Sequence, residues 1–189
     1  MGEDSTTQRG CFFCKSGRES DFVRQFGKTF PNGRALVPTR SRYRRIKDTA
    51  IEERVTLMPG YVFFELDAED ARRLQSELLS FFHSDSVLKL LRYTDGRWQL
   101  QDYDDRFARM LFETGGNIGI SQAYFDVNRR IRILSGFLKD YEGSIVRVNR
   151  KAKTVEVRVD LQGKKVSMKL GYEMVAPVDP QAEHDSTGP

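Results

Sequence analysis

The sequence has few of the residues on which secreted proteins and many enzymes depend. Its 189 residues include only two cysteines and two histidines. Two cysteines cannot build a disulfide framework, so a reducing cytoplasm is the expected compartment. No apolar run approaches the ~20 residues of a membrane span, and the polar first ten residues lack the apolar segment of a secretory signal. We therefore expect a cytoplasmic protein without membrane contact.

The motifs of common catalytic sites are also missing. No nucleophile elbow, phosphate loop or zinc-protease motif occurs, and neither His83 nor His184 has a partner at metal-ligand spacing. The glycines of 115–119 precede no predicted helix and so form no phosphate loop. The sequence predicts a protein that is not an enzyme and that uses no cofactor or metal.

Cys11 and Cys14 leave one catalytic alternative open. A C-x-x-C pair is redox-active where a helix N-terminus lowers a thiol pKa. Here two phenylalanines separate the cysteines in an apolar run that favours a strand, and positions 11 and 14 of a strand point to opposite faces. One such pair supplies only two zinc ligands. We interpret both cysteines as structural and keep a thiol-redox protein as the alternative from another functional class.

Aromatic residues are plentiful (13 Phe, 7 Tyr, 1 Trp), so the chain has enough apolar surface to fold. The net charge of +4 is unevenly distributed: residues 1–126 are balanced, 127–178 carry 12 basic and 5 acidic side chains, and 179–189 are acidic. A compact basic module is typical of a protein that binds a polyanion. The alternative is a solvated basic face without a partner.

Hydrophobic periodicity predicts an α+β fold. In the first part, strands are expected at 11–14, 35–38, 61–66 and 87–91, with 97–100 pairing back across a turn, and helices at 19–30, 67–80 and 103–111. Asp67 is the expected N-cap of the second helix.

The second part predicts short strands and tight turns, typical of a small antiparallel barrel or curled sheet. Residues 113–126 contain three glycines and no clear period, and we interpret them as a flexible interdomain linker. The predicted organisation is a disordered N-terminus (1–10), an α+β domain (11–112), the linker (113–126), a β domain (127–178) and a disordered tail (179–189).

The predicted strand at 61–66 is apolar on both faces. Alternation sends Tyr61 and Phe63 to one face and Val62 and Phe64 to the other. Both faces must therefore be covered. We expect helices on one face and a partner protein on the other.

A basic segment precedes this strand. Residues 40–47 contain five basic side chains in eight, dense enough to contact phosphates, and Tyr43 among them is able to stack on a base. The alternative is a mobile solvated loop, and we expect the segment to be disordered when unbound.

Together these features resemble the NusG family. Met58-Pro59-Gly60-Tyr61-Val62-Phe63-Phe64 is similar to the P-G-Y-V-F strand of NusG-type N-terminal domains, and Lys15-Ser16-Gly17-Arg18-Glu19 to the turn into their first helix. Residues 136–146 (Gly-Phe-Leu-Lys-Asp-Tyr-Glu-Gly-Ser-Ile-Val) resemble a KOW motif. The resemblance covers roughly residues 11–178. It implies a NusG-type N-terminal domain, an antiparallel sheet with helices, joined by a flexible linker to a small KOW β-barrel.

The resemblance implies a transcription elongation factor that binds bacterial RNA polymerase and suppresses pausing or termination. Family members contact polymerase, including the clamp helices of its largest subunit, through a set of positions in the N-terminal domain. In this sequence those positions hold Phe13, Met58, Tyr61, Phe63, Arg72 and Arg73. Lys15 and Arg18 lie where relatives approach non-template DNA, and we add Arg40, Arg42 and Arg44 to this DNA-binding set. The basic residues expected to bind RNA, in the KOW domain, are Arg147, Arg150, Lys151, Lys153, Arg158, Lys164 and Lys165.

The sequence departs from the family at two positions. Arg9-Gly10 replaces the aromatic pair that usually opens the first strand, and Gln162 replaces the aromatic residue that docks on Rho or ribosomal protein S-ten. Residues 149–153 and 168–175 look more like LoaP-type specialised antiterminators, whose KOW domain reads an RNA hairpin. We therefore predict a LoaP-like factor, and nothing demands more than a monomer. The alternatives are a general NusG that couples polymerase to Rho or the ribosome, and a ribosomal RNA-binding module without polymerase contact.

Overall fold

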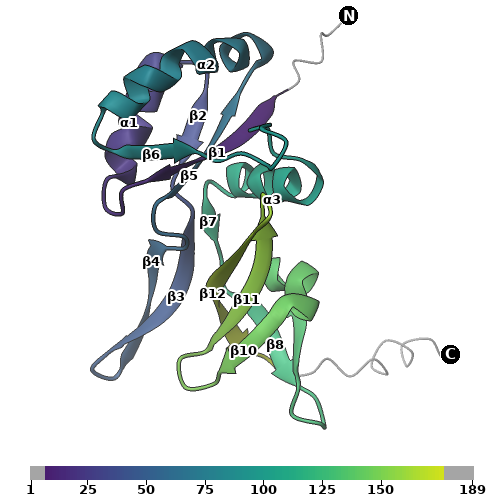
Figure 1. The fold of residues 1–189 in the computed structure, drawn as a ribbon. Helices are drawn as coiled ribbons and strands as arrows, with labels where there is room; N and C mark the ends of the chain where they lie inside the picture. Colours follow the sequence, from purple (N-terminus) through teal and green to yellow (C-terminus); the bar gives the residue numbers. More distant parts are fainter. Residues whose placement is uncertain (1–6, 177–189) are drawn as a thin grey trace, which may run out of the picture.

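The computed structural model describes residues 7–176, which form an α+β structure of three sheets (Figure 1). This confirms the predicted mixed fold. The predicted disordered segments lie partly outside this range, at 1–6 and 179–189, but residues 8–10 belong to the first strand, so that part of the prediction was wrong. Within 7–176, no helix has the length and apolar character that crossing a bilayer requires.

The first sheet is antiparallel and has the order β2-β5-β1-β6. Its strands are β1 (Gln8–Cys14), β2 (Arg34–Leu36), β5 (Tyr61–Leu66) and β6 (Val87–Leu90). Helices α1 (Glu19–Thr29) and α2 (Ala68–His83) cover one face, while α3 (Asp102–Glu113) lies on the other (Figure 1). Asp67 caps α2 by accepting a bond from the Asp70 amide at 2.8 Å, as predicted. Residues 97–100, predicted to pair back, form no strand.

The second sheet has the order β10-β11-β12-β8-β9. Its strands are β8 (Ser121–Phe125), β9 (Ile131–Ser135), β10 (Ile145–Asn149), β11 (Thr154–Leu161) and β12 (Lys164–Met174), and a 3-10 helix, η1 (Phe137–Ser144), follows β9. We predicted an antiparallel barrel or curled sheet. The observed sheet differs in one respect, because β12 pairs in parallel with β8.

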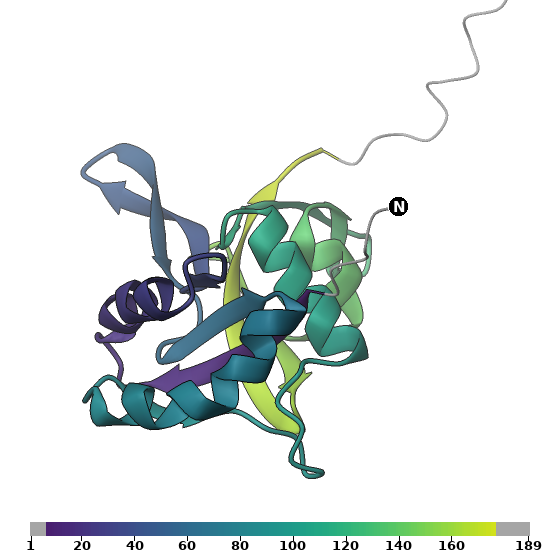
Figure 2. The same cartoon turned by 90° about the horizontal axis from the view of Figure 1, so that it is seen from above.

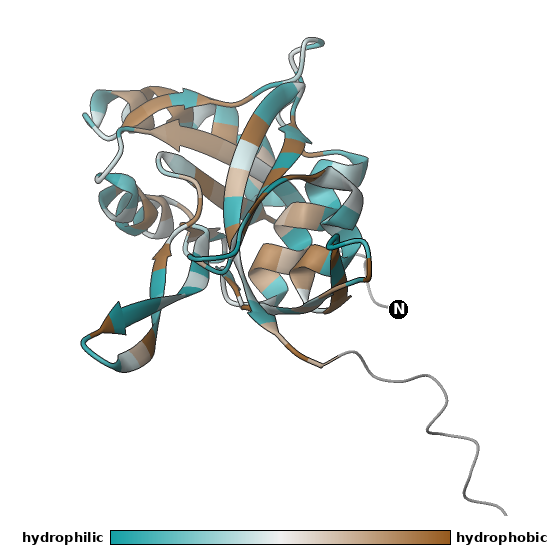
Figure 3. Ribbon diagram, turned by 90° about the horizontal axis from the view of Figure 1, so that it is seen from below, coloured by the Kyte–Doolittle hydropathy of each residue, from teal (hydrophilic) through white to brown (hydrophobic). Residues whose placement is uncertain are grey.

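The third sheet is a long hairpin with one short added strand. Strands β3 (Thr39–Ile46) and β4 (Thr49–Thr56) pair in antiparallel fashion, and β7 (Asn117–Ile118) pairs in parallel with β3. Seen from above, the hairpin projects from the body of the molecule (Figure 2). Figure 3 shows it as mostly hydrophilic, with apolar residues near its tip.

Two predictions about irregular segments were wrong. Residues 40–47 lie almost entirely in β3 and are paired with β4 along their length, so they are neither a mobile loop nor disordered. The predicted linker, 113–126, contains β7 and β8, each hydrogen-bonded to a strand far away in sequence. Both segments gain their order from backbone pairing, which hydrophobic periodicity does not report.

An aromatic core lies between the first sheet and helices α1 and α2. Its phenylalanine side chains are fully buried, with ring centroids 4.8–6.0 Å apart: Phe12, Phe22, Phe26, Phe30, Phe64 and Phe81. Trp98 closes one end against Phe64, at 5.4 Å. This is the helix-covered face predicted from the alternation at 61–66.

The Gly10 position is expected to tolerate no side chain. A Cβ built there would lie 2.3 Å from Phe64 Cζ and 2.8 Å from Trp98 Cε3. Gly10→Ala should therefore lower the free energy of unfolding by about 1–3 kcal/mol, because core rings must shift. Gly27→Ala in α1 is the matched control, since no atom lies within 4 Å of its Cβ and alanine favours a helix. Urea unfolding measures both variants, and equal stabilities would contradict the expectation.

Candidate functional site

The second face of the first sheet holds four residues expected to contact a partner. Phe63 and Met58 are buried, at 0% and 2% exposure, whereas Phe13 and Tyr61 are half-buried. The Phe13 and Tyr61 rings meet edge to face, with centroids 5.2 Å apart. These four residues, the sheet-face cluster, thus lie together at one apolar surface.

Helix α3 and the second sheet cover this cluster. An aromatic series leads from the first sheet outward: Phe63 meets Phe107 of α3 at 5.6 Å, Phe107 meets Phe137 of η1 at 6.0 Å, and Phe137 stacks on Tyr141 at 4.2 Å. In this structure the covering element is therefore part of the same chain, whereas the prediction placed a partner protein on this face.

Strand β11 supplies much of the covering surface. Its alternate residues Val155, Val157, Val159 and Leu161 are buried, as the strict alternation predicted. Val159 and Leu161 converge with Met58 and Phe107 around one small gap. One continuous apolar core therefore joins the first sheet, α3 and the second sheet.

A polar junction closes the edge of this core. The Asp104 carboxylate of α3 accepts hydrogen bonds from the Tyr93 hydroxyl at 2.6 Å and from the backbone amide of Gln162 at 2.9 Å. The side-chain Nε2 of Gln162 donates to the Trp98 carbonyl at 3.3 Å. Gln162 is only 5% exposed. Burial raises the pKa of Asp104, despite the two hydrogen bonds that favour its charged form. The turn of the β11–β12 hairpin is thus held against α3 by a buried carboxylate.

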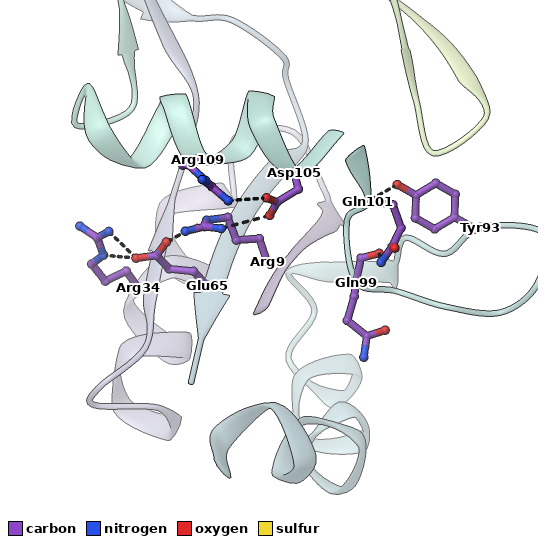
Figure 4. Close-up of polar contacts among 8 residues, drawn as sticks. All are labelled: Arg9, Arg34, Glu65, Tyr93, Gln99, Gln101, Asp105 and Arg109. Atoms are coloured by element: carbon purple, nitrogen blue, oxygen red, sulfur yellow. Dashed lines mark hydrogen bonds and ion pairs between the residues drawn. The ribbon is translucent and has the colours of Figure 1, made fainter. Parts of the chain in front are cut away.

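An ion-pair chain also links the first sheet to α3 (Figure 4). Arg9 of β1 donates to Glu65 of β5 and to Asp105 of α3, both at 3.1 Å. Glu65 also accepts from Arg34 of β2, and Asp105 pairs with Arg109 at 3.2 Å. Arg9, which departs from the family pattern, thus joins two acidic side chains, with its own side chain only 13% exposed.

The two cysteines lie on opposite faces of β1, as the strand interpretation predicted. Cys11 belongs to the core beneath α3, and Cys14 to the core beneath α1 and α2. Burial raises the pKa of both thiols, that of Cys14 to about 12. A redox-active thiol requires the opposite shift. The structure therefore does not support the thiol-redox alternative.

The other residues predicted for the N-terminal domain are spread over its surface. Arg72 and Arg73 lie on α2, across the sheet from the sheet-face cluster, and Arg73 pairs with Asp70 at 2.8 Å. Lys15 and Arg18 lie in the exposed turn between β1 and α1, where they pair with Asp85 and Asp21. The structure does not bring these four residues together with the sheet-face cluster.

The hairpin arginines and the second sheet form a basic cleft of about 450 Å³. The cationic residues that line it come from β3, β10 and β12: Arg40, Arg42, Arg44, Arg147 and Lys169. Residues predicted separately to bind DNA and RNA therefore share one concave surface.

The remaining predicted RNA-binding residues occupy three other places. Arg150 stacks over the Phe125 ring at 4.0 Å, and Lys151 and Lys153 are exposed in the turn that follows it. Arg158 lines a separate hollow with the carboxylates of Asp102, Asp104, Asp140 and Asp160. Lys164 lies beside Lys89, which lowers the pKa of Lys164. Lys164 and Lys165 lie at the opposite end of β11 and β12 from the 150–153 turn.

Comparison with known proteins finds likenesses among solved structures only. No family model matches this chain, and no curated protein matches it. Among solved structures it is similar to one described as "Domain interaction in Thermotoga maritima NusG", at 18% identity and a TM-score of 0.47, over 88% of this chain and 94% of that chain.

Proposed function

We propose that this chain is a NusG-type transcription elongation factor of the LoaP-like antitermination kind. In this proposal the sheet-face cluster binds bacterial RNA polymerase, and the basic second sheet binds a leader RNA hairpin. The observation that supports it is the apolar second face of the first sheet, which among the described residues is covered by α3 and the second sheet. The resemblance to the NusG family assigns polymerase contacts to the cluster residues on this face.

The proposed mechanism involves no covalent chemistry. A protein that binds one polymerase conformation more tightly than another shifts the enzyme toward that conformation. Attachment to RNA through the second sheet would hold the factor near its polymerase site and raise the effective concentration of that second contact. The charge of residues 127–178, 12 basic against 5 acidic, supports the RNA-binding part of the proposal.

In the structure the second sheet is docked on α3 and the first sheet, and we call this arrangement the docked form. The docked form limits access to the proposed polymerase site. Phe63 and Met58 are buried beneath α3 and β11, so polymerase has to displace these elements to reach them. The apparent affinity is then reduced by the small fraction of molecules that are open. We infer that the docked form is a closed state, which opens before the factor engages polymerase.

Gln162 argues against the general NusG alternative. The family's aromatic residue at this position docks on Rho or ribosomal protein S-ten, whereas Gln162 is polar and buried against α3. A side chain so placed offers no exposed aromatic contact.

Co-sedimentation with bacterial core RNA polymerase tests the proposal. We expect weak binding of the wild-type chain and at least tenfold tighter binding of Gln162→Glu, which opens the docked form. Tyr61→Ala in the Gln162→Glu background should abolish binding, because Tyr61 is a half-buried member of the sheet-face cluster that packs against Phe13. Circular dichroism checks that each variant is folded. If neither the wild type nor the folded Gln162→Glu chain binds polymerase, the proposed function is wrong.

A further inference from the structure

The basic cleft between the β3–β4 hairpin and the second sheet has an unusual charge balance. Five cationic side chains line it, and among the described lining residues the only carboxylate is Glu156. Arg42 and Arg44 are held by Glu53 of β4, at 2.6 Å and 3.7 Å. No ion pair is found for Arg147 or Lys169 within residues 7–176. The cleft therefore concentrates positive charge that its own carboxylates do not balance.

Arg40 lines the cleft with a guanidinium whose hydrogen bonds are only partly satisfied. Its Nη1 atom is fully buried and has no hydrogen-bond partner among the described residues. Burial, and then the neighbouring charge of Arg42, lower the pKa of Arg40, although an arginine remains protonated at neutral pH. No ion pair is found for Arg40 among the described residues, so its charge favours a phosphate that enters the cleft.

The position of the hairpin beside the sheet is fixed by a close backbone approach. A Cβ at Gly171 of β12 would lie 2.9 Å from the Ser41 carbonyl of β3. Nearby, the Tyr43 hydroxyl donates to Glu173 of β12 at 3.3 Å. These contacts hold Arg40 and Arg147 on opposite walls of one cleft, so the site exists only while the two sheets are docked.

We propose that this cleft binds the phosphodiester backbone of a single-stranded nucleic acid, with Arg40 and Arg147 contacting phosphate from the two walls. Guanidinium groups form strong charge-assisted bonds to phosphate oxygens, and the Tyr43 ring, which also lines the cleft, offers a surface on which an unpaired base stacks. Because the bound strand would touch both walls, it stabilises the docked form. A single strand in the cleft would then oppose polymerase binding, in contrast to a leader hairpin bound to the second sheet outside the cleft, and this last consequence alone rests on the proposed function.

The test uses the full chain and two fluorescein-labelled single strands of about ten nucleotides, RNA and DNA of the same mixed sequence. Fluorescence anisotropy gives the affinity as a function of KCl concentration. We expect Arg40→Gln and Arg147→Gln each to weaken binding about tenfold and to reduce the salt slope by about one. Arg45→Gln is the matched control, because Arg45 is exposed on the same strand but does not line the cleft, and it should weaken binding less than twofold.

Two further comparisons decide the result. The double variant Arg40→Gln/Arg147→Gln should lose less than the product of the single losses, because both side chains hold the same strand. Gly171→Val, which removes no charge but forces the hairpin from the sheet, should weaken binding as much as the double variant. Binding of either strand with this pattern supports the site, and the RNA-to-DNA ratio reports any contact to the 2′-hydroxyl. No binding of either strand, or an equal loss in Arg45→Gln, overturns it, whatever the outcome with polymerase.

Discussion

Glu65→Ala is expected to destabilise the fold by about 3 kcal/mol, because it removes the buried carboxylate that pairs with Arg9 and Arg34. Glu65 is 8% exposed and accepts bonds from arginines of β1 and β2. Its loss leaves the nearly buried guanidinium of Arg9 with Asp105 as its only partner within residues 7–176, so much of the desolvation cost of Arg9 is no longer offset. The variant should lower the urea midpoint of unfolding and loosen the contact between β1 and α3.

Glu53→Ala is the matched control for this prediction. Glu53 also lies between two arginines, Arg42 and Arg44, but in the projecting hairpin, where solvent weakens ion pairs. Its replacement should cost less than about 1 kcal/mol. The double variant Arg9→Met/Glu65→Leu should recover most of the loss, since apolar side chains of similar volume often replace a buried ion pair without penalty. Equal destabilisation by Glu65→Ala and Glu53→Ala would show that burial of the ion pairs does not determine their contribution to stability.

Several local features of the fold could be predicted from the sequence. Local patterns were reliable: the alternation of β11 and the Asp67 cap of α2 are both present in the structure. The hairpin was missed because its turn, at Lys47 and Asp48, has no glycine, although Lys47 adopts a φ of 53°. The dense positive charge of residues 40–47 was also not typical of a strand, although backbone pairing with β4 orders this segment.

The candidate site was predictable only in part. Alternation in β5 correctly separated Tyr61 and Phe63 from Val62 and Phe64, and it required a cover on each face. It could not identify that cover, because the contacts join residues far apart in sequence, such as Asp104 and Gln162. Nor could spacing show that Arg40 and Arg147 line one cleft, since their proximity depends on docking of the two sheets.

Gln162→Glu is expected to open the docked form at neutral pH. The wild-type side chain donates to the Trp98 carbonyl, the residue is 5% exposed, and its backbone amide donates to the Asp104 carboxylate. A glutamate there has no donor for that carbonyl and adds a second negative charge, which should weaken docking by about 2–4 kcal/mol. Gln162→Met is the matched control, because it removes the donor and keeps the volume without adding charge.

Acidification should close the Gln162→Glu variant again. Burial already raises the pKa of Asp104 in the docked form, so docking favours its protonated state. For a carboxyl whose pKa is raised by docking, stability is greatest at low pH and is lost as the pH rises from about 4 through the raised pKa. A carboxyl group at position 162 is a second group whose pKa docking is expected to raise. The stability of the docked form should therefore fall with pH more steeply in Gln162→Glu than in the wild type, whereas Gln162→Met should follow the wild type.

Trp98, the single tryptophan, supplies the carbonyl of this junction, while its ring packs against Phe64 of the aromatic core. Opening removes the Gln162 turn from beside it, so its fluorescence should change at pH 8 but not at pH 5 in Gln162→Glu. A shift equal at both pH values, or the same shift in Gln162→Met, would mean that charge beside Asp104 does not control docking. Because polymerase binding is proposed to require the open form, the affinity of Gln162→Glu for polymerase should follow the same pH curve. That parallel would link the buried carboxylate directly to exposure of Phe63 and Met58.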